Sequence, residues 1–184
     1  MEKLLQDIRN NGVDIACVDD LIKISIQHRK LIPLIIGCIQ SVDSERDKEF
    51  LVRCLGVKGF YEASRPLVNE FYRSNSILLK WAIGNTLSII KDPDILPDLI
   101  KIAQNKEHGI ARQMIVDGLG FYKTDDVKNV LVELLTDDDV TGHAISAIRK
   151  IGDKELARHI EPFMDHEKTW IRNEAIKTVK KLRI

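Results

Sequence analysis

The sequence predicts an all-α protein: a right-handed α-solenoid, or α/α superhelix, of about five helical hairpins that follow an N-terminal helical cap. Three observations support this prediction. Leu, Ile and Val dominate the apolar residues, while aromatic residues make up only 5% of the chain, as suits helices packed on helices. Apolar residues recur at the spacing of amphipathic helices. The helical pattern then repeats about every 30 residues, which is typical of a solenoid whose hairpins stack on their neighbours.

The N-terminal cap is predicted to contain two helices. Residues 1–10 carry the apolar stripe of a short amphipathic helix, formed by Leu4, Leu5 and Ile8. The sequence Asn10-Asn11-Gly12 ends this helix. A second helix is predicted within residues 13–28, where Asp19 or Asp20 can cap it. Its apolar face is expected to include Leu21, Ile22 and Ile26.

The first hairpin begins with a segment that is apolar almost all round, residues 31–40, which predicts a helix buried between neighbours. The second helix of this hairpin is expected to begin after Ser44, because Ser44-Glu45-Arg46-Asp47 resembles a capping box with Asp in place of Glu. Its inward residues are predicted to be Phe50, Leu51, Cys54 and Leu55.

Five copies of the hairpin can be aligned on one apolar position in each helix. The first-helix references are Leu34, Leu67, Leu99, Leu131 and Ile160, at spacings of 33, 32, 32 and 29 residues. The second-helix references are Leu55, Leu87, Leu119, Ile148 and Val179, at spacings of 32, 32, 29 and 31 residues. Each second-helix reference precedes the next first-helix reference by 12 residues. A constant gap indicates a constant turn between the copies.

Other repeat architectures fit less well, because LxxLxL strands, the TPLH motif and the 34-residue Trp-Leu-Gly-Tyr pattern are all missing. Residues 95–100 (Ile-Leu-Pro-Asp-Leu-Ile) resemble the start of the first helix of HEAT repeats, and residues 170–176 resemble the start of the second. Asp92-Pro93 and Gly152-Asp153 match the turn between HEAT units. The chain from Leu31 to Ile184 therefore resembles HEAT repeats, especially the short variety of phycobilisome-lyase-like proteins. This resemblance implies a fold and says little about function.

The resemblance also implies a ladder of basic residues seven positions before the second-helix references. HEAT units commonly use this residue to bond the backbone or an Asp in a neighbouring turn. A structural role is therefore favoured over ligand binding. The fourth copy departs from the pattern, because it has Thr141 and the acidic turn Asp137-Asp138-Asp139. The five positions of the ladder are Lys48, Lys80, Arg112, Thr141 and Arg172.

A partner is expected to bind on the concave side, where a solenoid presents its second helices in parallel. Positions six and two before each second-helix reference share one outward face. The candidate partner-binding residues are Glu49, Arg53, Trp81, Asn85, Gln113, Asp117, Ser146, Asn173 and Lys177, with Gly142 at the remaining position.

The two tryptophans are interpreted differently. Trp81 stands in the outward row among polar or small residues, so it is a candidate anchor for a partner, with packing against a neighbouring helix as the alternative. Trp170 shares a row with Leu78 and Ile110, nine residues before the references. This shared apolar character predicts that Trp170 packs in the core.

Charge and cysteine content favour a cytoplasmic protein. Lys plus Arg and Asp plus Glu both number 28, so no overall field attracts nucleic acid or an anionic membrane. Cys17, Cys38 and Cys54 are odd in number and widely spaced, which favours reduced thiols. Residues 1–7 carry acids where a signal peptide would be basic and then apolar. The longest apolar run, residues 31–39, is too short for the roughly 20 residues that span a bilayer.

No catalytic, metal-binding or cofactor-binding signature is evident. HExxH, Walker, GxGxxG and nucleophile-elbow motifs are missing, and His159 and His166 lie seven residues apart without zinc-ligand spacing. The five histidines are interpreted as surface residues. Charge is locally uneven: acids dominate residues 125–139, and a basic segment ends the chain. Its cations Lys177, Lys180, Lys181 and Arg183 suit a helix C-terminus or an acidic or phosphate-bearing partner.

The sequence as a whole favours a non-enzymatic, protein-binding scaffold or adaptor without a cofactor. We expect one repeat domain over residues 1–184, with the cap in 1–28 and the five hairpins in 29–184. Two alternatives are a nucleic-acid-binding protein, since HEAT-like DNA glycosylases for alkylated bases share the architecture, and a helper similar to chromophore lyases. Charge neutrality and the acids Glu49 and Asp117 argue against nucleic acid. The partner, the process and the oligomeric state stay open.

Overall fold

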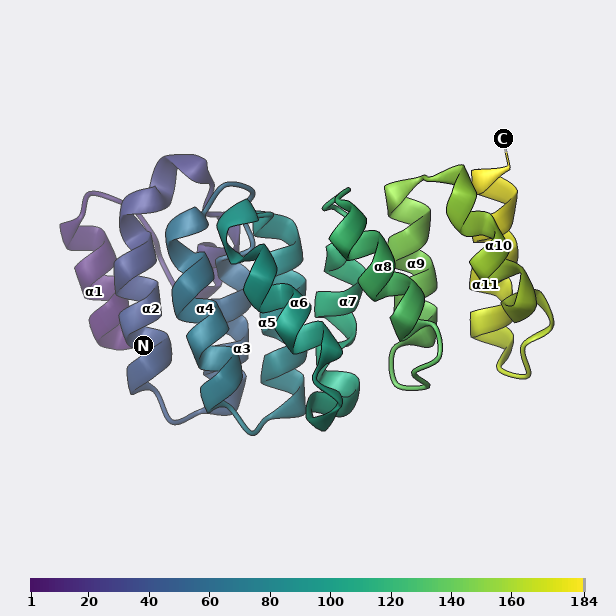
Figure 1. Cartoon of the computed structure of the whole chain (residues 1–184). Helices are drawn as coiled ribbons and strands as arrows, with labels where there is room; N and C mark the ends of the chain where they lie inside the picture. The colour runs from purple at the N-terminus through teal and green to yellow at the C-terminus, as the bar shows by residue number, and fades with distance from the viewer. Residues whose placement is uncertain (184) are drawn as a thin grey trace. The chain divides into compact units, whose positions relative to one another are not determined.

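Helices account for all regular structure in residues 1–183, the part of the chain that the computed structural model describes, and no strand occurs among them. The chain divides into two compact units, Met1–Ile95 and Leu96–Ile184. The predicted hairpins are present in order: their first helices are α2, α4, α6, α8 and α10, and their second helices are α3, α5, α7, α9 and α11 (Figure 1). The expected all-α solenoid of stacked hairpins is confirmed. One continuous domain over 1–184 stays a prediction.

The first unit contains the N-terminal cap and two hairpins. Within it, α2 packs on α4 and α3 packs on α5, so first and second helices form two layers, with α1 against α2 (Figure 1). Ser44 and Ser76 cap α3 and α5, because their hydroxyl oxygens accept from the backbone N–H of Asp47 and Leu79 at 3.3 and 3.2 Å. The elements are α1 (Glu2–Asn10), two 3-10 helices (Val18–Lys23 and Ile26–Leu31), α2 (Ile32–Ser41), α3 (Glu45–Cys54), α4 (Tyr61–Arg73), α5 (Ile77–Ile90) and a 3-10 turn (Pro93–Ile95).

The second cap helix is a wrong prediction. Residues 13–28 form no α-helix and contain instead the 3-10 helix Val18–Lys23 and the start of the 3-10 helix Ile26–Leu31. Leu21 is buried as expected, whereas Ile22 is 69% exposed and Ile26 is 48% exposed.

Side chains that compete for backbone groups explain this difference. The Asp20 carboxylate accepts from the backbone N–H groups of Ala16 and Cys17, at 2.9 and 3.2 Å. Farther on, the backbone N–H of Ser25 donates to Nδ1 of His28 at 3.0 Å. Such local hydrogen bonds satisfy the backbone at single turns and interrupt the ladder that a continuous α-helix needs.

The second unit contains three hairpins. Here α6 packs on α8, α7 packs on α9, and α9 packs on α11 (Figure 1). Gly109 interrupts the beginning of the second helix of the third hairpin. Its φ of 50° is one that residues with a side chain rarely adopt. The elements are α6 (Leu96–Gln104), a 3-10 helix (Lys106–Arg112), α7 (Gln113–Leu119), α8 (Asp125–Leu134), α9 (Thr141–Ile151), a 3-10 turn (Lys154–Leu156), α10 (Ala157–Ile160), a 3-10 turn (Glu161–Asp165) and α11 (Thr169–Leu182).

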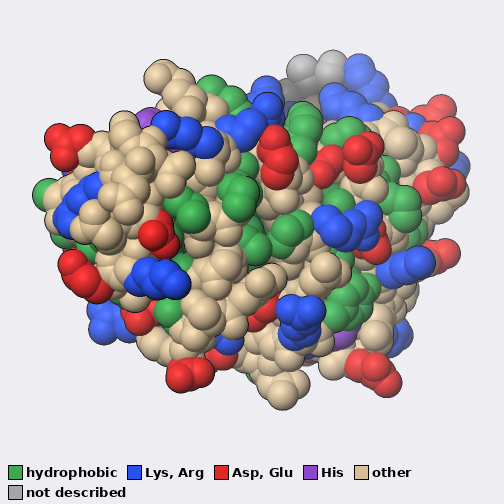
Figure 2. Space-filling view, turned by 90° about the vertical axis from the view of Figure 1, so that its left-hand side faces the viewer, with side chains coloured by type: hydrophobic (Ala, Val, Ile, Leu, Met, Phe, Trp, Pro, Cys, Tyr) green, Lys and Arg blue, Asp and Glu red, His purple; other side chains and the backbone are tan. Residues whose placement is uncertain are grey.

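The reference positions form the core of the hairpins. Nine of the ten reference residues are buried, and Leu34 alone is half-buried. Leu34 lines a shallow hollow between α1 and α2, together with Met1 and Pro33. Figure 2 looks onto this side of the molecule and shows hydrophobic side chains between scattered acidic and basic ones. Charges of both signs therefore mix on this face, in line with the zero net charge.

Candidate functional site

Arg112 is a structural staple, as the resemblance implied. Its side chain is fully buried, and its guanidinium group donates to the carbonyl oxygens of Ala103 and Gly109 at 2.7 and 3.1 Å. The same group pairs with the Asp137 carboxylate at 2.7 Å and lies 3.9 Å from that of Asp139. The acidic turn before α9 is thereby tied to the preceding hairpin.

The electrostatics of this pair favour the ionised carboxylate. Burial by itself raises the pKa of Asp137, but the hydrogen bond and charge of Arg112 outweigh burial and lower the pKa below its ordinary 3.8. Thr141, which replaces a basic residue in the ladder, donates from its hydroxyl to the Asp137 carbonyl at 2.8 Å. Asp137 in the acidic turn therefore bonds to two residues of the ladder, Arg112 and Thr141.

The other ladder residues also contact their own surroundings. Arg172 donates to the His166 carbonyl at 2.8 Å, and Lys80 lies 5.2 Å from the ring centre of Phe71. Lys48 reaches the Glu70 carboxylate at 3.8 Å. Arg172 therefore bonds to backbone as the resemblance implied, whereas Lys48 and Lys80 contact a glutamate and an aromatic ring instead.

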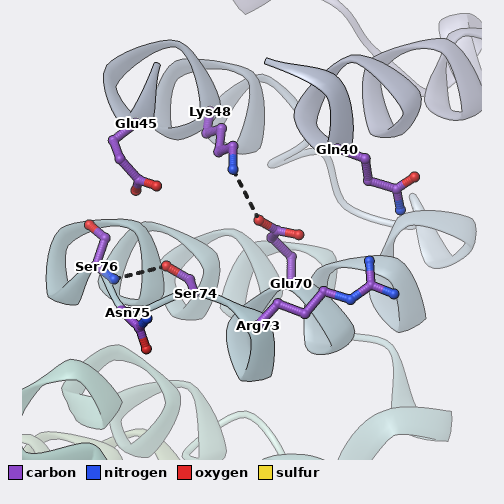
Figure 3. A pocket seen from close by; sticks show the side chains of 8 residues that line it. All are labelled: Gln40, Glu45, Lys48, Glu70, Arg73, Ser74, Asn75 and Ser76. Atoms are coloured by element: carbon purple, nitrogen blue, oxygen red, sulfur yellow. Dashed lines mark hydrogen bonds and ion pairs between the residues drawn. The ribbon is translucent and has the colours of Figure 1, made fainter. Parts of the chain in front are cut away.

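The Lys48–Glu70 pair lies in a polar hollow that the sequence did not reveal. The hollow measures about 540 Å³ and lies at the turn edge of the first unit (Figure 3). Figure 3 shows Lys48 pointing across it toward Glu70, while the backbone N–H of Ser76 donates to the Ser74 hydroxyl at 3.0 Å. The lining residues are Gln40, Glu45, Lys48, Glu70, Arg73, Ser74, Asn75 and Ser76. The charges of Glu45 and Glu70 balance those of Lys48 and Arg73, so the charge of the hollow favours neither anions nor cations.

Four candidate partner-binding residues lie in the first unit, on α3 and α5. Glu49 and Arg53 form an ion pair at 2.7 Å on α3. The Arg53 guanidinium carbon lies 5.9 Å from the ring centre of Trp81 on α5, within range of a cation–π contact. Trp81 and Asn85 are both half-buried. The structure therefore brings Glu49, Arg53 and Trp81 into one cluster, with Asn85 one helical turn farther along α5.

The row nine residues before the references is exposed, so the prediction of core packing for Trp170 is wrong. Leu78, Ile110 and Trp170 are 70%, 48% and 51% exposed. Leu78 and Trp170 lie two and a half α-helical turns before their references, so both face away from the buried reference, whereas Ile110 lies in the 3-10 helix before α7. Counting turns from the reference would have found this from sequence.

Leu78 extends the cluster around Trp81. It precedes Trp81 by three residues and Asn85 by seven, which places all three on one stripe of α5. We call Glu49, Arg53, Leu78, Trp81 and Asn85 the Trp81 surface. It combines an apolar side chain, an aromatic ring and a fixed cation on two packed helices.

The remaining candidate residues lie in the second unit, and two of them contact the following hairpin. Gln113 donates from its side-chain amide to the Asp139 carbonyl at 2.8 Å. Asp117 pairs with Lys150 on α9, whose ammonium also donates to the Asp117 carbonyl at 3.1 Å. Ser146 on α9 is half-buried. Asn173 and Lys177 are exposed on α11.

Gly142 is buried beneath Trp170. An added Cβ would lie 2.0 Å from the indole ring, so only glycine leaves room for the ring in this arrangement. The ring of His143 contacts Trp170 with 5.6 Å between ring centres, and Nδ1 of His143 is buried without a hydrogen-bond partner. His143 is thus half-buried rather than a surface residue. Burial lowers the pKa of His143 below its ordinary 6.5.

The described residues contain no cluster of metal ligands, and their three cysteines differ in exposure. Among residues 1–183, no group of three His, Cys, Asp or Glu side chains is placed to hold a metal ion. Cys17, Cys38 and Cys54 are free thiols, and burial raises the pKa of Cys54 to about 12. The Cys54 thiolate is therefore scarce at neutral pH.

Stacked helical hairpins and a ladder of stapling residues define the class of protein as an α-solenoid. The family of HEAT repeats matches residues 64–142 and 96–180, which together span more than half of the chain. The chain belongs to the HEAT-repeat family. No curated protein matches it. Within the described residues, no helix has the length and apolar character needed to cross a membrane.

Proposed function

We propose that this chain is a non-enzymatic, cytoplasmic scaffold or adaptor that binds a protein partner through the Trp81 surface. The observation that supports this most directly is the exposure of Leu78 beside the half-buried Trp81, on a helix anchored in the repeat core. HEAT repeats commonly act as protein-interaction scaffolds.

The composition of the Trp81 surface suits recognition of a protein. Trp and Arg are enriched among the residues that dominate binding energies at interfaces. Arg53 is held in place by Glu49, so less side-chain freedom is lost when a partner covers it. Asn85 adds a polar group that can set the orientation of the partner.

Quantitative affinity capture from native lysate, with mass spectrometry, tests this function. The tagged wild-type chain is compared with Trp81→Ala and Leu78→Ser, after circular dichroism has shown that each variant is folded. Loss of a binding anchor costs about 2 kcal/mol or more, so partner recovery is expected to fall about thirtyfold. Tyr61→Ala is the matched control, because Tyr61 is a 48% exposed aromatic residue on α4, outside the Trp81 surface.

If Trp81→Ala, Leu78→Ser and Tyr61→Ala all recover as much partner as the wild-type chain, the Trp81 surface does not bind the partner. A titration with duplex DNA at two salt concentrations separates the nucleic-acid alternative. Phosphate contacts produce a steep decrease of affinity with salt. We expect the Trp81 surface to contribute no such salt dependence to DNA binding, because Arg53 is already paired with Glu49.

A further inference from the structure

Neighbouring second helices meet in a recurring way within each unit. On α5, the Thr86 hydroxyl donates to the Val52 carbonyl of α3 at 3.1 Å. On α11, the Thr178 hydroxyl donates to the Ile145 carbonyl of α9 at 3.5 Å. In both cases the threonine lies one residue before its reference, and the carbonyl three residues before the preceding reference. The docking of one second helix on the previous one therefore follows a common register.

Charged pairs follow the same register in the second unit. Arg149, one residue after its reference on α9, pairs at 2.5 Å with Glu174, five residues before its reference on α11. Asp117, two residues before its reference on α7, pairs with Lys150, two residues after its reference on α9. A charge at position −2 of the earlier helix thus pairs with one at position +2 of the later helix. A charge at position +1 of the earlier helix pairs with one at position −5 of the later helix.

The same face of α11 is open. On α9, the residues at positions −6, −3 and +1 are Gly142, Ile145 and Arg149, and each contacts α11. The corresponding positions of α11, together with position −2, are all exposed, and Ile176 among them is 42% exposed. We call these four residues the open face of α11: Asn173, Ile176, Lys177 and Lys180.

The charge of the open face specifies its occupant. Lys177 stands at the position of Asp117 on α7, Lys180 stands at the position of Arg149 on α9, and no acid lies on the face. A helix that docks in the common register would complement them with acids at positions +2 and −5, seven residues apart. The Thr86 and Thr178 contacts place a threonine or a small residue between these acids, four residues after the first.

Second helices of a second copy do not meet these requirements. Position −5 is Phe50, Ala82, Met114 and His143 in α3, α5, α7 and α9. Only α11 has an acid there, but its Trp170 would meet Asn173 instead of glycine, and a Cβ at Gly142 would already lie 2.0 Å from that ring. Two open faces placed against each other would bring Lys177 and Lys180 of both copies together, which is repulsive.

We propose that the open face of α11 docks an acidic amphipathic helix of another protein, with two carboxylates seven residues apart and a threonine or small residue four positions after the first. Ile176 supplies the apolar contact, and Lys177 and Lys180 pair with the two acids. This site lies in the second unit and does not depend on the Trp81 surface.

The probe is a labelled peptide with the sequence of residues 169–182, carrying Trp170→Ala and Lys181→Glu. It keeps Glu174 and Thr178, so its acids are seven residues apart. A side-chain crosslink on its opposite face maintains the helix, because isolated helices of this length are marginal in water. The control peptide has glutamine in place of both acids: it carries Glu174→Gln, and Lys181→Gln instead of Lys181→Glu. Fluorescence anisotropy with the full-length protein at low salt measures both affinities.

The acidic peptide is expected to bind about three- to thirtyfold more tightly than the control peptide, with the difference shrinking at high salt. The double variant Lys177→Glu/Lys180→Glu is expected to lose this preference and to favour a peptide with lysines at both acid positions. Lys106→Glu/Lys154→Glu, a charge reversal at two exposed lysines outside α11, is the matched control and should bind like the wild type.

Several results would overturn the proposal. One is equal binding of acidic and control peptides, and another is a charge-reversed protein that gains nothing for the lysine peptide. Tighter binding of duplex DNA or anionic vesicles that depends on Lys177 and Lys180 would assign the face to phosphate. A dimer in sedimentation experiments that Lys177→Glu/Lys180→Glu abolishes would assign it to a second copy.

Discussion

Replacement of Arg112 is expected to destabilise the second unit severely. Arg112→Met keeps the apolar stem but leaves the Ala103 and Gly109 carbonyls and the Asp137 carboxylate without their main partner. Removal of one member of a buried ion pair costs about 3–5 kcal/mol. A unit of this size is stable by about 0.05–0.15 kcal/mol per residue, so this loss is a large part of its total stability.

The two tryptophans make this effect measurable in one unit at a time. Trp81 lies in the first unit and Trp170 in the second, and the chain has no other tryptophan. Denaturant unfolding of a Trp81→Phe background follows the second unit by Trp170 fluorescence, and a Trp170→Phe background follows the first. We expect Arg112→Met to lower the midpoint of the Trp170 transition strongly.

The double-mutant cycle with Asp137→Asn isolates the ion pair. Asn keeps an acceptor for the backbone N–H of Asp139, which Asp137 now binds at 3.2 Å. The double variant is expected to be more stable than the sum of the single changes predicts, by about 1 kcal/mol or more. Arg172→Met is the control, because Arg172 holds the same ladder position but is only half-buried.

A cost below about 1 kcal/mol for Arg112→Met, or strict additivity with Asp137→Asn, would refute the reasoning. The pair also has a pH signature. The pKa of Asp137 is lowered in the folded state, so its contribution to stability is present above pH 3.8 and is lost as pH falls through the folded pKa. Asp137→Asn is expected to weaken this loss.

Two further predictions concern the contact around Trp170. Gly142→Ala is expected to lower the free energy of unfolding by about 1–3 kcal/mol and to shift Trp170 fluorescence, because the added Cβ overlaps the indole. Gly37→Ala is the control and should be neutral or stabilising, because an added Cβ at Gly37 meets nothing within 4 Å. Similar results for both variants would contradict the contact between Gly142 and Trp170. His143 has a lowered pKa in the folded state, so its contribution to stability is present above pH 6.5 and declines as pH falls through the folded pKa, while the unfolded chain takes up the proton. His143→Gln should flatten this part of the stability profile, and an unchanged profile would refute the assignment.

The repeat pattern could be predicted because it depends on local periodicity, and the Arg112 staple because the resemblance to HEAT repeats implied it. Each hairpin buries its apolar positions against its neighbours, so residues such as Leu87 and Leu119 repeat with a register that the sequence alone reveals. The helix in residues 13–28 could not be predicted in the same way. There the apolar spacing favours a helix, but the Asp20 side chain satisfies nearby backbone groups and the helix does not form.

The sequence by itself determined the class of fold, the order of the hairpins and the choice of Trp81 as a candidate anchor. The exposure of Leu78 and Trp170 follows from counting helical turns from the references, but only the tertiary structure decided that Trp170 packs over Gly142. It also decided that Asp117 is used between helices while Lys177 is exposed. The physical reason is that exposure and charge pairing depend on which helix packs beside a residue, and a repeat period does not specify that neighbour.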